Sequence, residues 1–132
     1  MALQLAFDTP KSEWLPPTEL PNIFEAKQIA IDVETRDPNI KTLGPGWARN
    51  DGEVVGYAVA VSDWSGYIPI RHKYGGNLDE RIVNKWLKKV FECPADKIMH
   101  NAQYDLGWIR QMGFQVNGRI IDTMVVASLL DE

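Results

Sequence analysis

The sequence predicts one domain of the α/β class, in which helices flank a mixed five-stranded sheet. Two observations lead to this prediction. The chain has 132 residues, 45% hydrophobic and 24% charged, which is enough for one hydrophobic core but not for two domains. Short apolar runs typical of strands come first, and further runs then alternate with segments of helical periodicity, as in a sheet covered by helices.

The first part of the chain, residues 1–27, is predicted to be an extended leader. The segment 14–21 carries three prolines, and proline fixes φ and removes a backbone donor. We expect the leader to pack along the domain or to connect it to a preceding segment. The alternative is an appended tail without a structural role. The domain itself is expected over residues 28–132.

Three strands are expected at the start of the domain. The apolar run 28–35 ends in acidic residues, as a buried strand can. A long polar loop over 36–52 follows, with prolines and glycines that favour turns. The runs 54–61 and 67–70, joined by a turn at 63–66, predict a hairpin. A proline in the second run places that strand at an edge of the sheet.

The most regular helical pattern follows these strands. Asn77 is expected to cap this helix, and Glu80, three residues later, completes a pattern similar to a capping box. Pro94 ends it. Apolar residues recur along one face at helical spacing: Leu78, Ile82, Trp86, Leu87, Val90 and Phe91.

The rest of the chain alternates between strand and helix. A short strand is expected over 97–100 and a helix over 104–112, with Gly113 at the position that a helix C-terminus favours. A fifth strand over 119–121 then leads into a helix over 123–130. Together with the early strands, this order predicts the mixed sheet with flanking helices.

Charge and cysteine content restrict the setting. The formal net charge is −4 and Cys93 is the single cysteine, so no disulfide can form within the chain and a reducing cytoplasm is expected. The sequence has no apolar run of about 20 residues that would cross a membrane. Proteins that bind nucleic acid through their own cations are usually basic. The acidity therefore argues against such binding, or it indicates metal ions held by carboxylates.

Asp32 and Glu34 are the first candidate site. Residues two apart on a strand point to the same face, so the two carboxylates project together and repel one another unless a cation or a proton intervenes. Carboxylate oxygens are the ligands that Mg²⁺ and Mn²⁺ prefer. The alternative is a pair of solvent-exposed acids at a frayed strand end.

The segment from His100 to Asp105 is the second candidate site. It follows a strand and opens a helix, so Asp105 falls in the first helical turn, where a negative charge is favourable in any case. Asp105 is therefore either a functional acid or a surface acid that compensates the helix dipole. Asn101 has a similar alternative as a simple helix cap.

Other patterns are weaker. His72 and His100 lack the spacing of zinc ligands, and no glycine-rich phosphate loop is present. The loop 36–49, with Lys41 and Trp47, could contact phosphate and stack on a base. The alternative is an ordinary surface loop with one packed tryptophan.

Taken together, the motifs resemble those of the DnaQ-like (DEDD) 3′–5′ exonucleases, of the kind attached to family A, phage-like, DNA polymerases. Residues 31–35 resemble the first motif, D-x-E-T, and residues 100–105 resemble the second, N-x-x-[YF]-D. Residues 121–124 resemble the strand-to-helix junction that follows. The resemblance covers the chain from about residue 27 onward.

The resemblance implies a ribonuclease H-like fold and a site with two divalent metal ions, Mg²⁺ or Mn²⁺. Asp32 would bridge both ions, Glu34 would bind the ion that holds the attacking water, and Asp105 would serve the second ion. Thr35 and Asn101 would seat the terminal nucleotide. The implied substrate is the single-stranded 3′ end of DNA, in the cytoplasm of a bacterium or a phage-infected host, beside a downstream polymerase domain.

One departure from the family pattern is expected to matter. The third motif, which supplies a fourth acid and a tyrosine or histidine four residues before it, does not occur after Asp105. Asp122 matches no metal-binding position, so it is expected to be a structural acid or a helix cap. The chain is thus predicted to be the N-terminal part of the exonuclease domain, truncated before the third motif, or else a naturally reduced relative. Two alternatives stay open: a catalytically incomplete nucleic-acid-binding or scaffold domain, and an RNase D-like exoribonuclease.

Overall fold

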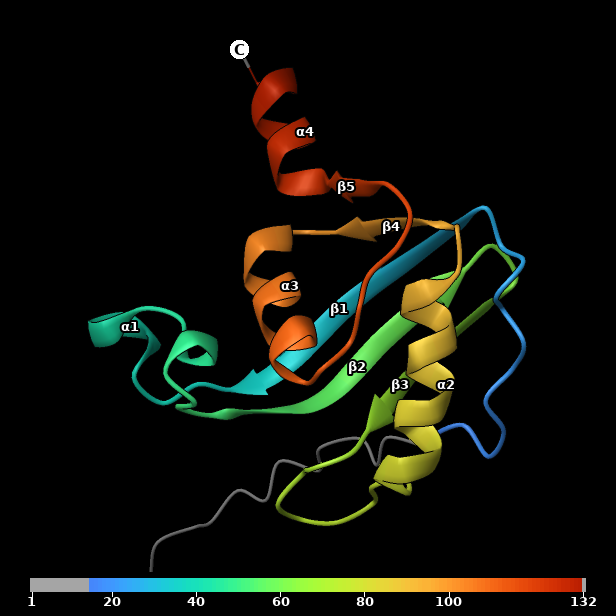
Figure 1. Cartoon of the computed structure of the whole chain (residues 1–132), viewed down its shortest axis with the longest axis horizontal. Coiled ribbons are helices and arrows are strands. Elements are labelled where there is room, and N and C mark those ends of the chain that lie inside the picture. Colours follow the sequence, from blue (N-terminus) through green and yellow to red (C-terminus); the bar gives the residue numbers. More distant parts are fainter. Residues whose placement is uncertain (1–14, 132) are drawn as a thin grey trace, which may run out of the picture.

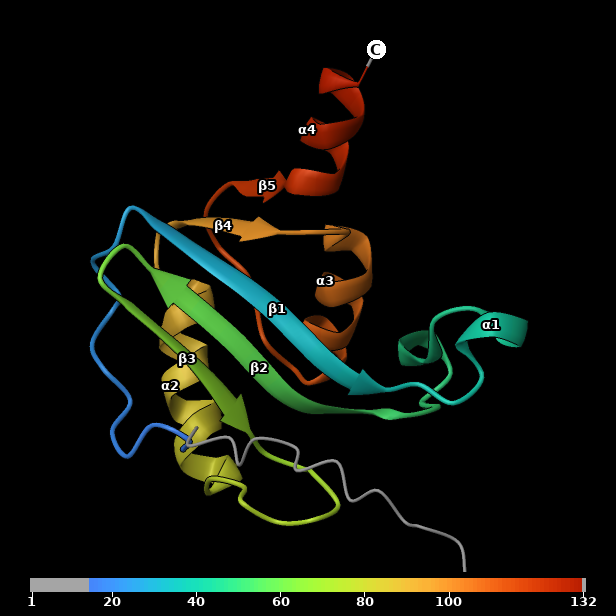
Figure 2. The same cartoon turned by 180° about the vertical axis from the view of Figure 1, so that it is seen from behind.

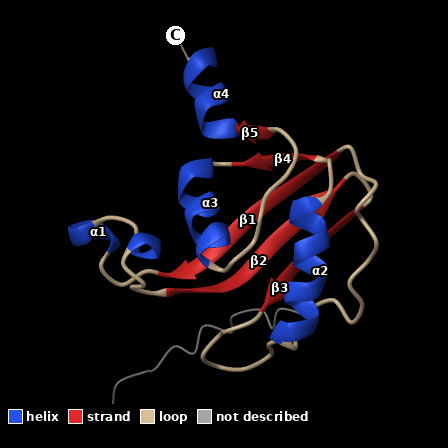
Figure 3. Cartoon of the chain, viewed as in Figure 1, coloured by secondary structure: helices blue, strands red, loops and turns tan. Residues whose placement is uncertain are grey.

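The computed structural model describes residues 15–131, and its centre is one five-stranded sheet in the order β3-β2-β1-β4-β5. Figures 1 and 2 show the sheet from its two sides, and Figure 3 distinguishes strands from helices. The strands are β1 (Gln28–Arg36), β2 (Glu53–Val61), β3 (Trp64–Pro69), β4 (Asp96–Met99) and β5 (Ile120–Asp122). The helices are α1 (Ile40–Leu43), the 3-10 helix η1 (Gly46–Ala48), α2 (Glu80–Glu92), α3 (Ala102–Gln111) and α4 (Thr123–Leu130).

The pairing of the strands confirms the predicted mixed sheet. β1 lies antiparallel to β2 and parallel to β4, while β2 pairs antiparallel with β3 and β4 pairs parallel with β5. Both views show α2 and α3 packed on the same face, so within residues 15–131 no helix covers the other face of β1, β2 and β3 (Figures 1 and 2). In the described part of the chain, no helix is long and apolar enough to cross a membrane.

The β2–β3 hairpin and the edge position of β3 are confirmed, but the turn is tighter than predicted. β3 begins at Trp64, which pairs with Val61, so three residues expected in the turn belong to the strand. The reason is a tertiary contact, because the Trp64 ring packs edge-on against Trp86 of α2 with ring centroids 6.1 Å apart. A turn pattern in the sequence does not contain that contact.

The predicted cap of α2 is wrong. Asp79 is the cap, and its carboxylate accepts a hydrogen bond from the backbone amide two residues later. The side chain of Asn77 instead bonds the backbone of His72 as both donor and acceptor. Glu80 forms an ion pair with Arg71 and does not reach back to complete a capping box.

The predicted apolar face of α2 is confirmed at Trp86, Leu87, Val90 and Phe91 but is wrong at Ile82. Ile82 is 63% exposed, whereas Val83 and Leu87 are fully buried. Spacings of three and four residues link Val83 to Trp86, Leu87 and Val90, so the true stripe is itself helical in period. The pattern admits two neighbouring phases, and the contacts with the sheet select one.

The described part of the leader packs along α2. Ile23 is buried in the core, and Leu20 and Phe24 are partly buried against it. The indole nitrogen of Trp86 donates a hydrogen bond of 2.7 Å to the carbonyl of Pro21, which fixes the leader at the edge of the helix. The predicted leader also includes residues 1–14, which lie outside the described residues.

The start of β4 is held by a buried lysine. The Lys97 side chain is fully buried, and its ammonium donates hydrogen bonds to the backbone carbonyls of Cys93, Ala95 and Asn117. A buried cation is stable only when its donors are satisfied. Here the three carbonyls tie the loops before β4 and before β5 to one point.

Trp86→Ala should reduce the free energy of unfolding by about 3–5 kcal/mol, since it removes a buried aromatic side chain and leaves a cavity. Urea denaturation of the wild type and the variant measures this loss. Ile82→Ala is the matched control from the same helix, and its effect should stay within about 0.5 kcal/mol because the side chain is exposed. Equal losses in both variants would contradict the observed phase of α2.

Candidate active site

Asp32 and Glu34 lie on the face of β1 that carries no helix. Ile31 and Val33 are buried on the helix-covered face, whereas Asp32 and Glu34 are exposed on the opposite face, so the two acids share a face as the alternation predicts. In the sheet register Asp32 is opposite Ala58 of β2. The small neighbour leaves the Asp32 carboxylate accessible from the open face.

Asp105 reaches β1 because β1 and β4 separate. These parallel strands pair only over residues 28–30 of β1, and the start of α3 follows directly beyond that point. Asp105 is 3% exposed, and the backbone amide of Val33 hydrogen-bonds its carboxyl group. Its atom Oδ2 is buried without a hydrogen-bond partner among the described residues. Asp105 is therefore not a surface acid that compensates the helix dipole.

The three acids concentrate negative charge at the end of β1. Burial is the main cause that raises the pKa of Asp105, and the charges of Asp32, Glu34 and Asp122 add to it, giving a value of about 7. The hydrogen bond from Val33 opposes this shift. Near neutral pH the Asp105 carboxyl group is thus poised between its two forms, and a proton or a cation would relieve the repulsion.

The donor atoms suit a hard divalent cation, although they do not form a finished coordination shell. A buried, unpaired carboxylate oxygen of Asp105 lies near two accessible carboxylates, and Mg²⁺ and Mn²⁺ prefer oxygen ligands of this kind. Within residues 15–131, however, no group of three or more Asp, Glu, His or Cys side chains is placed so that it could hold a metal ion. The carboxylate oxygens are thus suitable ligands for such an ion, but the three acids are not placed closely enough in this structure to hold one.

Thr35 is turned toward α3. A register shift between Glu34 and Thr35 interrupts the ladder with β2, and the Thr35 hydroxyl lies 2.8 Å from the hydroxyl of Tyr104. Tyr104 also donates a hydrogen bond of 3.0 Å to a carboxylate oxygen of Asp37. The motifs name Thr35 but leave Asp37 out, since the sequence around Asp37 indicates only a turn.

Asn101 occupies the cap position of α3 with a left-handed φ of 61° and makes no side-chain cap hydrogen bond. The interpretation of Asn101 as a helix cap by its side chain is therefore wrong. Asp122 caps in its place, because its carboxylate accepts from the backbone amides of Asn101, Ala102 and Met124. The expected structural role of Asp122 is confirmed, and these amide bonds hold its pKa below the usual range. Asn101 stays exposed at the start of α3.

A groove crosses the open sheet face beside Asp32. Its floor contains the small side chains of Ala30, Ala58 and Ala60, and Tyr67 and His100 are among the residues that line it. The motifs mark His100 but not this floor, because small residues on a strand carry no sequence signal for a groove.

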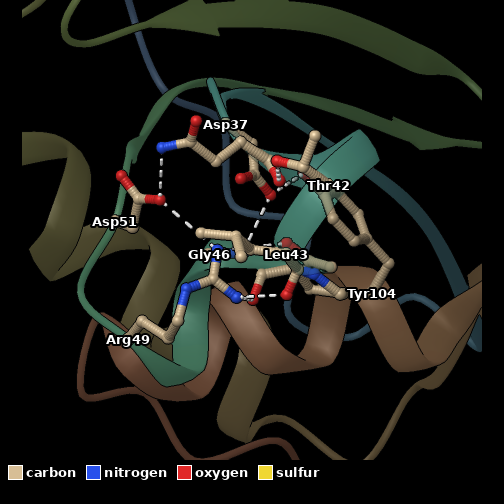
Figure 4. A network of polar contacts seen from close by, with 10 residues as sticks. Asp37, Thr42, Leu43, Gly46, Arg49, Asp51 and Tyr104 are labelled. Atoms are coloured by element: carbon tan, nitrogen blue, oxygen red, sulfur yellow. Dashed lines mark hydrogen bonds and ion pairs between the residues drawn. The ribbon is translucent and has the colours of Figure 1, made fainter.

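The loop between β1 and β2 is folded onto α3, and it contains the two short helices α1 and η1, which the sequence pattern does not predict. A Cβ atom placed on Gly107 of α3 would lie 2.4 Å from the Trp47 ring, so the indole packs directly on the helix. Arg49 bonds the carbonyls of Leu43, Gly44 and Pro45 inside the loop (Figure 4). For Trp47 the structure shows the packed alternative.

No family model matches the chain. The sequence is 40% identical over 116 residues to a DNA-directed DNA polymerase of Pseudomonas phage M6, a match that covers 83% of this chain and 17% of the polymerase. It is 26% identical over 108 residues to DNA polymerase I of a Synechocystis strain, covering 77% of this chain and 10% of that protein. The chain therefore spans less than a fifth of the length of these relatives.

Solved structures show the same fold. NrnC of Brucella melitensis with bound Mg²⁺ superimposes with a TM-score of 0.55 at 21% identity, over 83% of this chain and 49% of NrnC. The EXO domain of Aedes aegypti Nibbler gives a TM-score of 0.56 at 14% identity, over 83% of this chain and 49% of that domain.

The chain thus shares a ribonuclease H-like fold with these solved structures. Its sequence relatives are phage and bacterial DNA polymerases. The two comparisons confirm the resemblance that the motifs indicate.

Asp105→Asn should remove a pH dependence of stability in EDTA. The pKa of Asp105 is about 7 in the folded chain against 3.8 unfolded, so the folded state binds this proton more tightly. The stabilisation that this proton gives to the folded state is complete below about pH 4 and is lost as the pH rises through about 7. Across that window the wild type should lose roughly 2–4 kcal/mol of unfolding free energy relative to Asp105→Asn.

Urea denaturation at several pH values measures this difference. Asp63→Asn, which changes an acid in the exposed β2–β3 turn, is the control and should follow the wild-type curve. Parallel curves for the wild type and Asp105→Asn would show that Asp105 is not held in a desolvated, negatively charged environment.

Proposed function

We propose that this chain carries the first two acid motifs of a 3′–5′ exonuclease domain that hydrolyses phosphodiester bonds at the single-stranded 3′ end of DNA. The observation that carries the proposal is the buried, unpaired carboxylate oxygen of Asp105 beside Asp32 and Glu34. A bound cation would relieve the repulsion among these acids. The DNA polymerase relatives support DNA as the substrate, and proofreading is the task we propose.

The residues proposed to hold two divalent ions, Mg²⁺ or Mn²⁺, are Asp32, Glu34 and Asp105. Asp32 is proposed as the ligand shared by both ions, since it contributes the largest charge effect on Asp105 and, like Glu34, is exposed on the open face. When bound, such ions lower the pKa of a water molecule and stabilise the leaving 3′ oxygen. The Mg²⁺ bound to NrnC, which shares this fold, supports the choice of metal.

Thr35 and Asn101 are proposed to position the terminal nucleotide. The hydroxyl of Thr35 is fixed by Tyr104 at the end of β1, and the Asn101 amide is exposed at the start of α3 without a capping role. The two side chains come from different elements, β1 and the start of α3. Polar groups fixed in this way can hold a sugar-phosphate in one orientation relative to the attacking water.

The proposed setting follows from the relatives. Residues 28–132 would form the N-terminal part of the exonuclease domain, with residues 1–27 as the leader and a polymerase domain downstream. The proposed compartment is the cytoplasm of a bacterium or of a phage-infected host, since the relatives are phage and bacterial DNA polymerases.

Calorimetry with Mn²⁺ in metal-free buffer tests the metal assignment. The wild type should bind Mn²⁺, and Asp32→Ala should weaken binding by at least about tenfold, since it removes the proposed bridging ligand. Asp63→Ala removes one negative charge from the distant hairpin turn and should bind as the wild type does. Equal binding by the wild type and Asp32→Ala would sink the assignment.

Activity is tested on 5′-labelled single-stranded DNA. A polypeptide that adds a helix with the family's Y-x-x-x-D or H-x-x-x-D third motif should shorten the DNA from its 3′ end. The 132-residue chain should act slowly or not at all, since small misplacements of reacting groups can cost about 10²-fold in rate. Glu34→Ala in the longer polypeptide should abolish the ladder, and an unchanged ladder would remove Glu34 from the mechanism.

A further inference from the structure

The hydroxyl of Tyr104 connects the two acid motifs. It contacts the hydroxyl of Thr35 at 2.8 Å and a carboxylate oxygen of Asp37 at 3.0 Å. Thr35 directly follows the acid Glu34 on β1, and Tyr104 directly precedes the acid Asp105 on α3. One phenol thus touches the strand of the first motif and belongs to the helix of the second.

The direction of these hydrogen bonds follows from the carboxylate. An ionised carboxylate only accepts hydrogen bonds, so Tyr104 gives its single proton to Asp37. The phenol oxygen is then left as an acceptor, and Thr35 must donate to it. Asp37 therefore sets the orientation of both hydroxyl groups, since the chain of donors ends on its carboxylate.

Asp37 is itself fixed from the loop side. Its Oδ2 atom also accepts a hydrogen bond of 3.0 Å from the backbone amide of Gly46. A Cβ atom on Gly46 would lie 2.8 Å from Oδ1 of Asp37 and 1.7 Å from the carbonyl oxygen of Asp51. Only glycine fits at this approach, and the loop presents its amide to the carboxylate (Figure 4).

The loop is also held together by side-chain contacts among its own residues. The Asp51 carboxylate accepts hydrogen bonds from Asn39 and Arg49, both within the loop. This acid belongs to the same network as Asp37 (Figure 4), but its side-chain bonds do not reach α3. The loop therefore contains two acids of the same type, of which Asp37 bonds the motif helix and Asp51 bonds only the loop.

We propose that Asp37 is a positioning residue: through Tyr104 it fixes the end of β1 that follows Glu34 and the first turn of α3 that carries Asp105, and so sets the spacing between the two acid groups. The consequence for metal binding rests on the proposed function. The coupling between loop, strand and helix does not, because it can be measured without metal.

Tyr104→Phe is the decisive variant, since it breaks the chain of hydrogen bonds without changing charge. Asp37→Asn tests the other end, and Asp51→Asn is the control with the same loss of charge in the same loop. In EDTA, backbone amide exchange measured by NMR should become about fivefold faster at Thr35 and Asp105 in the first two variants, the loss expected for one hydrogen bond. Asp51→Asn should leave both amides unchanged.

The second readout is Mn²⁺ affinity measured by calorimetry. Tyr104→Phe and Asp37→Asn should each weaken binding by about 10–100-fold, as residues that orient metal ligands do. The Mn²⁺ affinity of the double variant should be no lower than that of the weaker-binding single variant, because both substitutions break the same chain of hydrogen bonds. Asp51→Asn should bind as the wild type does.

The outcomes separate the two ideas. Equal amide exchange in Tyr104→Phe and Asp51→Asn would overturn the positioning role of Asp37, as would wild-type Mn²⁺ affinity in Tyr104→Phe. Faster exchange at Thr35 and Asp105, in a wild-type chain that binds no Mn²⁺, would support the positioning role and reject the proposed metal site.

Discussion

The burial of the Asp105 carboxylate against β1 is the constraint around which the site is arranged. A carboxylate removed from water is costly unless it is paired or protonated, and here it receives one backbone amide bond from Val33 while Oδ2 has no partner in the described chain. The carboxylate is buried at the point where β1 and β4 stop pairing. The separation of these two strands gives the helix residue access to the acids of β1, and a continuous ladder would exclude it.

Four aspartates around this point show how environment divides the roles of one residue type. Asp122 is bonded by backbone amides and its pKa is lowered, so it stays ionised and structural. Asp37 accepts from Tyr104 and Gly46 and anchors a loop. Asp105 is buried with its pKa raised to about 7, and Asp32 is exposed on the open face. Asp105 combines a buried unpaired oxygen with repulsion from Asp32, a combination that favours a functional site.

Local sequence patterns predict the parts of this structure that depend on local geometry. The alternation along β1 places Asp32 and Glu34 on one face, and the apolar runs predict the β2–β3 hairpin, because strand period and hairpin formation are properties of neighbouring residues. The errors concern contacts between distant residues. Ile82 and Asn77 fit their local patterns, yet packing on the sheet selects Val83 and the geometry of the helix start selects Asp79.

The site shows the same division. The motifs mark Asp105, but its burial depends on the separation of β1 from β4, which no segment of sequence displays. Asp37 lies in a loop whose pattern indicates only turns, and its partner Tyr104 is 67 positions away in the chain. The sequence periodicity likewise does not predict helices α1 and η1, because each is shorter than the window in which a helical repeat can be recognised.

The stability of helix α4 depends on what covers its apolar side chains. Helix α4 has no buried residue, and its apolar side chains are 43–80% exposed at Met124, Val125, Val126, Leu129 and Leu130. A helix of eight residues is marginal in water by itself. Its cap, Asp122, divides one carboxylate between the starts of α3 and α4. An apolar surface that covers α4 would therefore also stabilise the first turn of α3, which carries Asp105. The folding of α4 and the position of Asp105 are in this way thermodynamically linked.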